Sequence, residues 1–281
     1  MPVITMTQEM ATLGKDVALG VCEALGLEQV RHEVGDVVAG KMHVKKSLIR
    51  RLRDGKASTI ERWAADEKTI SIFTAEEVFD LAVRGNVLIR GWGATQWLRP
   101  VAHIPGIKVC SPMPLRIKRL MARLETDDES LARKEIRVDD AARATRMAEH
   151  FDVTWGDPSL YDLTVNTERV SVATCVDLVV ALAKSAEFAE SPASRQRLLD
   201  LALAARVRAA LRANPDTSGV DVIESVTNGE LVLSGIVTDQ AERERCVEVA
   251  GKVAGVTTVT NQLGVIAGSL GGRIFPGGLT R

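Results

Sequence analysis

The chain has 281 residues, of which 46% are hydrophobic and 26% charged, with a formal net charge of −1. This length suffices for two domains. The near-zero charge and the 4% of aromatic residues argue against a nucleic-acid surface with base-stacking platforms and against an anionic-membrane surface.

Cysteine spacing and hydropathy indicate the compartment. The four cysteines lie far apart, without a CxxC pair, so we expect reduced thiols. The N-terminal residues lack a basic-then-apolar signal pattern, and no apolar run approaches the ~20 residues of a membrane span. We predict a cytoplasmic protein with no membrane span and no nucleic-acid partner.

Short apolar runs alternate with helical patterns over the first two thirds of the chain. The predicted strands are 2–7, 86–93, 107–112 and 161–167. The predicted helices are 15–25, 45–53, 75–84, 114–124, 129–149 and 171–186. This alternation predicts an α/β domain over 1–186, in which a parallel sheet carries helices on both faces. Such a sheet binds ligands beyond the carboxyl ends of its strands.

The composition changes near Pro192, where small and polar residues predict a linker over 187–196. The elements expected after it are helices over 195–214 and 239–256 and strands over 220–226, 230–237 and 257–266. Asn228-Gly229 is a hairpin signal between the first two of these strands, and Gly255 is expected to end the second helix. The pattern predicts a small α+β domain over 197–266, with helices on one sheet face, and a flexible glycine-rich tail over 267–281.

The stretch EMATLGKD, residues 9–16, lies between the first predicted strand and helix. A phosphate-binding loop, G-x-x-x-x-G-K-[ST], holds phosphate on consecutive backbone N–H groups, with a lysine nearby. Gly14 and Lys15 match its end, whereas Glu9 replaces the first glycine and Asp16 the magnesium-binding hydroxyl. The alternative is an ordinary helix that begins with Gly-Lys.

The segment VITMTQEMATLGKDVA resembles the opening of the cytidylate-kinase-like family of P-loop nucleoside monophosphate kinases, whose loop reads roughly I-T-I-S-R-E-Y-G-S-G-G-R-E-I-A. The likeness continues in GNVLIRGWGATQWLR, PLRIKRLMAR, WGDPSLYDL and NTERVS, over about residues 3–185. Gln8 replaces an arginine of the family, and Ala11 and Leu13 replace glycines. A leucine at a positive φ costs on the order of 1 kcal/mol.

The resemblance implies a site for phosphoryl transfer, in which cations stabilise charge on the transferred group. The implied nucleotide- and phosphate-binding residues are Thr12, Leu13, Gly14, Lys15, Asp16, Arg116, Arg119 and Asp140. Lys15 and Arg143 are the implied catalytic residues, the latter on the family's D-x-x-R lid motif. Arg90 and Trp92 are assigned to the acceptor side. Trp92 replaces an arginine there, and strand alternation predicts that Arg90 points to the other face.

The sequence also bears on metal binding. The histidines lack the spacing of a metal site, so no protein-bound metal is assigned, and Mg²⁺ is expected to arrive with ATP. Arg31-His32 replaces the Asp-Arg pair that the family carries after its first helix.

The segments ELVLSGIV and VAGVTTVTNQLGV resemble the BON domain. The matching positions are Gly229, Leu231, Leu233, Gly235, Val237, Gly255, Val256, Val259, Asn261 and Leu263. The resemblance implies a fold without catalytic residues, associated with phospholipid surfaces, small ligands or protein partners. A ligand-sensing or assembly role is expected, and homo-oligomerisation stays open.

These patterns leave two hypotheses. The first is a nucleotide-binding kinase that transfers a phosphoryl group from ATP to CMP or a similar nucleotide, regulated or assembled through the BON domain. The second is an inactive pseudo-kinase that senses a ligand or binds a protein partner. Leu13, Gln8 and Trp92 favour the second. The retained residues Lys15, Asp140 and Arg143 favour the first.

Overall fold

The computed structural model describes residues 2–31, 33–64 and 66–266, with the backbone alone for 62–64. His32 and the predicted tail 267–281 lie outside the described residues. The chain divides into two compact units, Met1–Ala205 and Arg206–Arg281. Among the described helices, none is both long enough and apolar enough to cross a bilayer.

The first unit is built on a sheet of five parallel strands, in the order β2-β3-β1-β4-β5. The strands are β1 (Val3–Gln8), β2 (Glu28–Val30), β3 (Val87–Arg90), β4 (Gly106–Cys110) and β5 (Leu163–Asn166). The hydrophobic run at the start of the chain forms β1, the central strand. The stretch that follows it therefore lies at the middle of the sheet's carboxyl edge.

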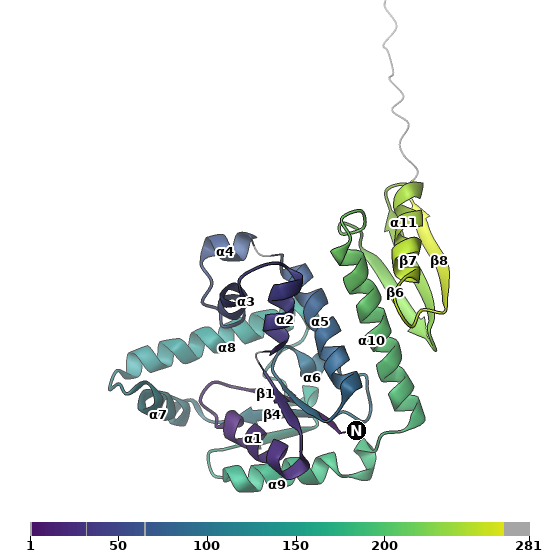
Figure 1. Ribbon diagram of the computed structural model, residues 1–281. Coiled ribbons are helices and arrows are strands. Elements are labelled where there is room, and N and C mark those ends of the chain that lie inside the picture. Colours follow the sequence, from purple (N-terminus) through teal and green to yellow (C-terminus); the bar gives the residue numbers. More distant parts are fainter. Residues whose placement is uncertain (1, 32, 65, 267–281) are drawn as a thin grey trace, which may run out of the picture. The chain divides into compact units, whose positions relative to one another are not determined.

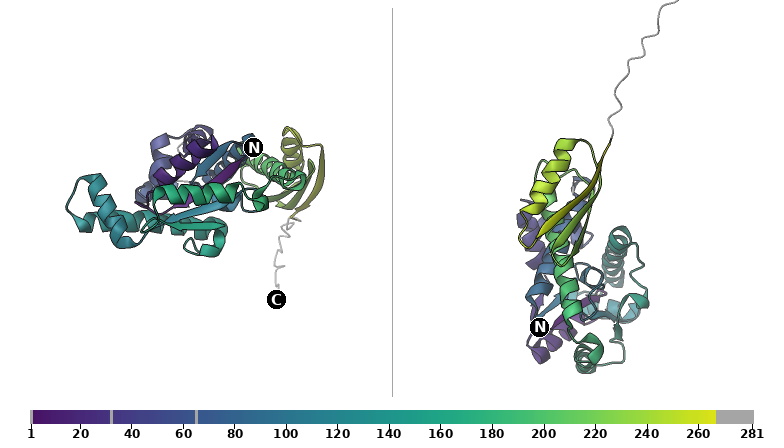
Figure 2. Two further views of the ribbon diagram at one scale, coloured as in Figure 1. Left: turned by 90° about the horizontal axis from the view of Figure 1, so that it is seen from below. Right: turned by 90° about the vertical axis from the view of Figure 1, so that its right-hand side faces the viewer.

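Helices cover both faces of this sheet (Figures 1 and 2), which confirms the predicted fold class. The helices are α1 (Gly14–Leu25), α2 (Glu33–Lys41), α3 (Lys46–Arg53), α4 (Thr59–Ala64), α5 (Glu67–Arg84), α6 (Ala94–Trp97), α7 (Met113–Leu124), α8 (Glu129–Phe151) and α9 (Val172–Ala183). Short 3₁₀ turns lie at Pro158–Leu160 and Ala186–Phe188.

The core between the sheet and the pair α1 and α9 explains the apolar pattern of these elements. Its fully buried members include Ile4, Met6, Val17, Val21, Leu88, Ile107, Cys175 and Val179. Val17 and Val21 are one helical turn apart, so α1 presents a single apolar face to β1. Burial of this face fixes the start of α1 directly above the end of β1.

Four elements of this unit do not follow from the apolar pattern. The short strand β2 and the helices α2, α4 and α6 were not predicted. Helix α5 begins at Glu67 instead of residue 75, because Asp66 caps it by accepting a hydrogen bond from the Thr69 N–H. The remaining predicted strands and helices are confirmed within a few residues.

The second unit contains a three-stranded sheet, in the order β6-β7-β8. Helix α10 (Pro192–Ala213) leads into it, followed by β6 (Val222–Thr227), β7 (Glu230–Val237), α11 (Gln240–Gly251) and β8 (Thr258–Val265). Strands β6 and β7 are antiparallel, and β7 and β8 parallel. Asn228 and Gly229 have φ of 51° and 83°, which confirms the predicted hairpin turn. The prediction that Gly255 ends the second helix was wrong, because α11 ends at Gly251.

Candidate functional site

The loop between β1 and α1 has an unusual backbone. Ala11 has a φ of 63° and Leu13 a φ of 60°, both in the left-handed region that favours glycine. Thr12, between them, is fully buried. The two positions are those where glycine stands in the family pattern, so the chain keeps a glycine-type conformation with other residues. Each left-handed residue costs about 1–2 kcal/mol.

This backbone leaves a row of N–H groups available. No described residue accepts a hydrogen bond from the backbone N–H groups of residues 10–15, whereas Asp16 and Val17 both donate to the Leu13 carbonyl. Alternating left- and right-handed residues turn consecutive N–H groups into one concavity, which suits an anion. The positive end of the α1 dipole adds to it.

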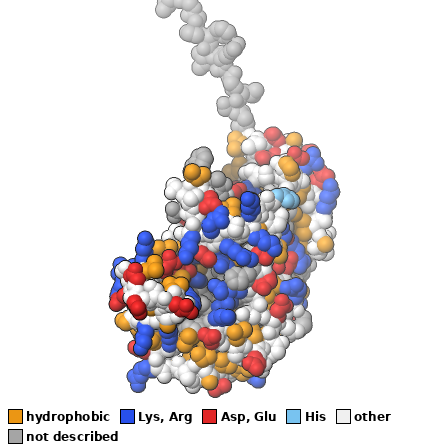
Figure 3. Space-filling model, turned by 60° about the vertical axis from the view of Figure 1, so that its left-hand side comes forward, with side chains coloured by type: hydrophobic (Ala, Val, Ile, Leu, Met, Phe, Trp, Pro, Cys, Tyr) orange, Lys and Arg blue, Asp and Glu red, His pale blue; other side chains and the backbone are white. Residues whose placement is uncertain are grey.

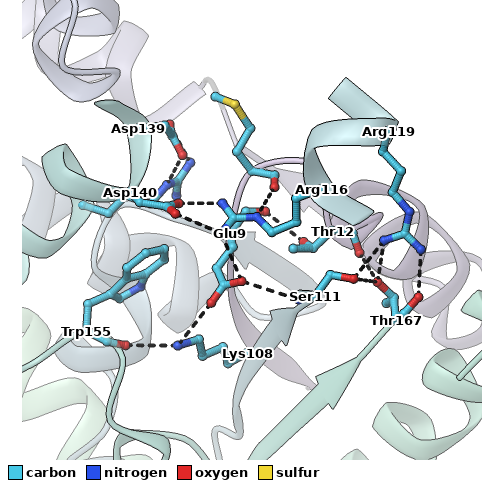
Figure 4. Close-up of polar contacts among 12 residues, drawn as sticks. Glu9, Thr12, Lys108, Ser111, Arg116, Arg119, Asp139, Asp140, Trp155 and Thr167 are labelled. Carbon is cyan, nitrogen blue, oxygen red and sulfur yellow. Dashed lines mark hydrogen bonds and ion pairs between the residues drawn. The ribbon is translucent and has the colours of Figure 1, made fainter. Parts of the chain in front are cut away.

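Three hydrogen bonds hold the loop carbonyls toward the protein. The Thr12 hydroxyl donates to the Glu9 carbonyl at 2.8 Å, and Thr167 Oγ1 donates to the Thr12 carbonyl at 2.7 Å. Arg116 Nε donates to the Met10 carbonyl at 2.8 Å. These bonds fix a loop backbone in which the N–H groups of residues 10–15 have no acceptor among the described residues, and Figure 4 shows the side chains that hold it.

Arg116, predicted to bind phosphate, is fully engaged with protein groups. It is 4% exposed, and its Nη1 and Nη2 donate to the two carboxylate oxygens of Asp140 at 2.9 and 2.7 Å. Its Nη1 also lies 3.5 Å from Glu9 Oε2. The side chain therefore connects α7, the loop and α8, and Asp140 acts as its partner (Figure 4).

Arg119 has a similar supporting position on α7. Its Nη1 donates to the hydroxyls of Ser111 and Thr167 at 3.1 and 3.0 Å, and its Nη2 to the Thr167 carbonyl at 2.8 Å. Thr167 in turn holds Thr12. Arg119 thus holds Thr167 in place, and Thr167 holds the Thr12 carbonyl of the loop.

Lys15 and Asp16 lie differently, because both are exposed on the first turn of α1. Gly14 precedes them and is buried, and a Cβ there would meet Gln8 Oε1 at 2.5 Å. The absence of a side chain at position 14 therefore lets Gln8 lie against the start of the helix. The loop, Lys15 and Asp16 together present a cationic, N–H-rich surface with one carboxylate.

A buried cation beneath the loop, Lys108, was not predicted. Lys108 on β4 lies 5.1 Å from the Trp155 ring centroid and 5.5 Å from that of Tyr161, with its Nζ 3.8 Å from Glu9 Oε1. Glu9 therefore lies between two cations, Lys108 and Arg116. A lysine in a strand carries no sequence signal for this role, since its partners come from distant segments.

A cavity of about 510 Å³ lies within the first unit, with Thr7 of β1 and Arg90 at the end of β3 among its lining residues. It is lined by five arginines, Arg31, Arg53, Arg90, Arg143 and Arg146, and by four aromatic residues, Trp92, Trp97, Phe151 and Trp155. Arg90 and Trp92 both line it, so the expectation that Arg90 points to the other face was wrong. The face of the molecule drawn in Figure 3 carries many lysine and arginine side chains.

The five cavity arginines outnumber the two carboxylates that line the cavity, Glu67 and Glu149, although Arg53 Nε also lies 2.9 Å from Asp54 Oδ1. Arg143 pairs with Asp139, at 2.7 Å from Nε to Oδ2. Burial and neighbouring arginines lower the pKa of Arg90 to about 10 and that of Arg146 to about 10. The same two causes lower the pKa of Arg31. These shifts mark a cavity in which an added anion would be stabilised.

Contacts of the Trp92 side chain explain why a tryptophan stands at this position. Its indole N–H donates to the Arg31 carbonyl, and its ring lies so close to α2 that a Cβ on Gly35 would meet it at 2.6 Å. The Arg53 guanidinium lies 5.1 Å from the ring centroid. Trp92 thus fastens the turn after β3 to α2 and holds Arg53 at the cavity.

Arg53 and Arg146 are cavity residues that the sequence did not single out. Arg146 stands three residues after Arg143 on α8, a spacing that places both on one side of a helix. Arg53 ends a basic helix with three other arginines or lysines and gives no distinguishing signal. Within the described part of the chain, no group of three or more His, Cys, Asp or Glu side chains is arranged to hold a metal ion.

A parallel sheet with an N–H-rich loop after its central strand defines a P-loop, kinase-like, nucleotide-binding scaffold. The model of the cytidylate kinase-like family matches residues 3–169, and that of the BON domain matches residues 200–267. The chain belongs to the cytidylate kinase-like family and carries a BON domain after it.

Known relatives are distant. The cytidylate kinase of Staphylothermus marinus is 30% identical over 118 residues, which cover 41% of this chain and 64% of that relative. The match therefore spans less than two thirds of the relative's length. An uncharacterized protein from Eubacterium ventriosum has a TM-score of 0.51 at 19% identity, over 66% of this chain and 99% of its own. Shikimate kinase from Bacteroides thetaiotaomicron has a TM-score of 0.41 at 11% identity, over 66% and 99%.

Proposed function

We propose that the protein transfers the γ-phosphoryl group of ATP to CMP or a similar nucleoside monophosphate, and that the BON domain regulates or assembles this activity. The observation that carries the proposal is the loop backbone. Ala11 and Leu13 hold a strained conformation, and the N–H groups of residues 10–15 have no acceptor among the described residues. Strain of this kind persists where surrounding contacts over-determine it, and it is concentrated at functional sites.

The donor phosphates would bind the loop. Lys15 extends from the same turn and would stabilise charge on the γ-phosphate during transfer. Arg116 and Arg119 would not contact the phosphates directly, because their guanidinium groups donate to the carbonyls of Met10 and Thr167. Their role is therefore to keep the loop shaped for phosphate.

The acceptor would bind in the cavity. Five arginines line it, against the two lining carboxylates of Glu67 and Glu149, so the lining carries more cations than anions and suits an anionic phosphate. The aromatic side chains, of which Trp92 lies beside Arg53 and Trp155 beside Arg143, offer rings against which a base can pack. Arg143 lines this cavity from the helix α8 and would contact the phosphate there.

Magnesium ion fits the residues around the loop. Asp16 is exposed beside the concavity formed by the N–H groups of residues 10–15. It offers the hard carboxylate oxygen that Mg²⁺ prefers, with the other ligands supplied by phosphates and water. Bound Mg²⁺ would neutralise charge on the β- and γ-phosphates. The Thr12 hydroxyl donates to Glu9 and is not free for this task.

A second function is favoured by specific contacts: a nucleotide-binding pseudo-kinase that works as an interaction module. Arg116 and Arg119, assigned to phosphate from the sequence, are saturated by protein partners. Trp92 stands where the family has an arginine and is fastened to α2. Under this alternative the nucleotide binds without turnover, and the BON domain carries the response.

Calorimetric titration of the full chain with ATP–Mg²⁺, then CMP, tests the proposal, beside Lys15→Ala and the matched variant Lys118→Ala. Lys118 is exposed on α7, outside the site. We expect ATP binding that is weakened about tenfold or more by Lys15→Ala and unchanged by Lys118→Ala. ADP formation that depends on CMP supports the kinase, and binding without ADP formation supports the pseudo-kinase. No binding of ATP contradicts both.

A further inference from the structure

Arg90 is a buried cation that lacks an anionic partner. It ends β3, is 5% exposed and forms no ion pair with any described residue. Its one hydrogen bond runs from Nη1 to Gln8 Oε1 at 3.1 Å. Its Nε is shielded from solvent and has no hydrogen-bond acceptor in the described part of the chain. Leaving a buried hydrogen-bond donor unpaired is unfavourable, so a ligand that accepts a hydrogen bond from Arg90 would stabilise this position.

The surroundings of Arg90 indicate which ligand this would be. Its hydrogen-bond partner, Gln8, lies against Gly14 at the start of α1, where the N–H nest ends. Arg90 also lines the arginine-rich cavity, together with Arg31 and Arg143. The guanidinium therefore lies at the junction between the loop for the donor phosphates and the cavity for the acceptor. A group passing from one to the other crosses this junction.

The electrostatics agree with that location. The nearby cations that act most strongly on Arg90 are Arg31, Arg53 and Arg143, and the carboxylate of Asp16 opposes them. A desolvated cation among like charges interacts more strongly with an incoming anion than a hydrated one does. The neutral amide of Gln8 orients Arg90 without cancelling its charge.

We propose that Arg90 contacts the phosphoryl group in transit and acts as a catalytic residue, with Gln8 as its positioning residue. This inference rests on the proposed function. An oxygen of the acceptor phosphate forms a bond to the γ-phosphorus of ATP, while the bond from that phosphorus to the bridging oxygen breaks. The electron pair of the broken bond leaves with ADP. The negative charge on the three remaining oxygens of the transferred group faces the Arg90 guanidinium.

The test uses full-length protein, ADP–Mg²⁺ and CMP, with and without aluminium fluoride, which mimics the transferring phosphoryl group. In the wild type, aluminium fluoride is expected to tighten ADP binding. Arg90→Met should lose this tightening by about tenfold or more while ADP affinity alone stays within about twofold, as expected for a contact made only in the transition state. Arg123→Met is the matched control, because Arg123 is exposed on α7.

A swap distinguishes charge placement from packing. Gln8→Arg combined with Arg90→Gln puts the guanidinium at the other end of the same hydrogen bond. We expect this double variant to recover part of the aluminium fluoride effect that Arg90→Gln alone loses. Arg90→Lys serves where Arg90→Met lowers the melting temperature.

The outcomes distinguish failure of the proposed function from failure of the role assigned to Arg90. ADP that does not bind the wild type contradicts the proposed function itself. ADP that binds the wild type, with no aluminium fluoride effect or with an equal effect in Arg90→Met, contradicts the role of Arg90 and leaves the nucleotide site standing. An equal loss of ADP affinity with and without aluminium fluoride assigns Arg90 to ground-state binding and also contradicts the proposal.

Discussion

Arg116 and Asp140 form a two-pronged ion pair, with N–O distances of 2.9 and 2.7 Å, that connects α7 to α8. The same guanidinium donates to the Met10 carbonyl in the phosphate-binding loop. Two residues assigned to phosphate from the sequence thus bind each other. Their contact couples the position of α8, which carries Arg143, to the shape of the loop.

Asp140→Ala should destabilise the first unit by about 2–3 kcal/mol, because it leaves a buried guanidinium with an incomplete set of acceptors. The four tryptophans all belong to the first unit, so their fluorescence in a urea titration reports its unfolding alone. The matched control is Glu129→Ala, which breaks the exposed Arg133–Glu129 pair and should cost about 0.5 kcal/mol or less. Equal losses in the two variants would contradict the supporting role of Asp140.

Ala11→Gly should stabilise the first unit by about 1 kcal/mol, since glycine adopts a φ of 63° without the steric cost of a Cβ. The control is Ala24→Gly in the last turn of α1, on its exposed side, which should destabilise by up to about 1 kcal/mol because glycine loses more backbone entropy in a helix than alanine. The readout is the same urea titration. A loss of stability in Ala11→Gly similar to that in Ala24→Gly would show that position 11 is not strained.

Gly35→Ala should destabilise the first unit by about 1–3 kcal/mol, because its Cβ would meet the Trp92 ring at 2.6 Å. Gly40, on the same helix, has open space where a Cβ would stand, so Gly40→Ala should be neutral or stabilising by up to about 1 kcal/mol. In a Trp92→Leu background the cost of Gly35→Ala should largely disappear. A cost that stays unchanged in that background would place the clash elsewhere.

The regular elements could be predicted where burial is periodic. Strand β7 has the predicted bounds, 230–237, because alternate residues are buried along its length. Strand β2 was missed, since it has three residues and a single buried side chain, Val30. Helix α2 was missed because Gly35 and Gly40 interrupt a short pattern.

The candidate site was less predictable than the fold. The resemblance gave the positions of the loop, and the structure adds that Ala11 and Leu13 adopt positive φ. Partner choice could not be read from spacing: Arg143 pairs with Asp139, while Asp140, one residue on, faces Arg116. A one-residue step turns a helical side chain by about 100°, so the facing element decides the partner. Arg53 and Arg146 reach the cavity only through the tertiary packing of α3 and α8.

Glu224 carries a buried carboxylate in the second unit. Its side chain is 1% exposed and lies 2.6 Å from Arg208 Nη2. Burial raises its pKa above the ordinary value of 4.5, and the hydrogen bond to Arg208 offsets only part of this rise. A carboxyl whose folded pKa is raised binds more protons folded than unfolded between the two pKa values. The stability contributed by Glu224 should therefore fall as pH rises from 4.5 through the raised value.

Hydrogen exchange of the β6 and β7 amides, corrected for intrinsic rates, measures this stability in the full chain. We expect protection to fall as pH rises above 4.5 in the wild type and this slope to flatten in Glu224→Gln. Glu230→Gln, at an exposed position on β7, should keep the wild-type slope. Protection that rises with pH in the wild type and loses that rise in Glu224→Gln would mean that Arg208 outweighs burial, with the pKa of Glu224 depressed in the folded unit.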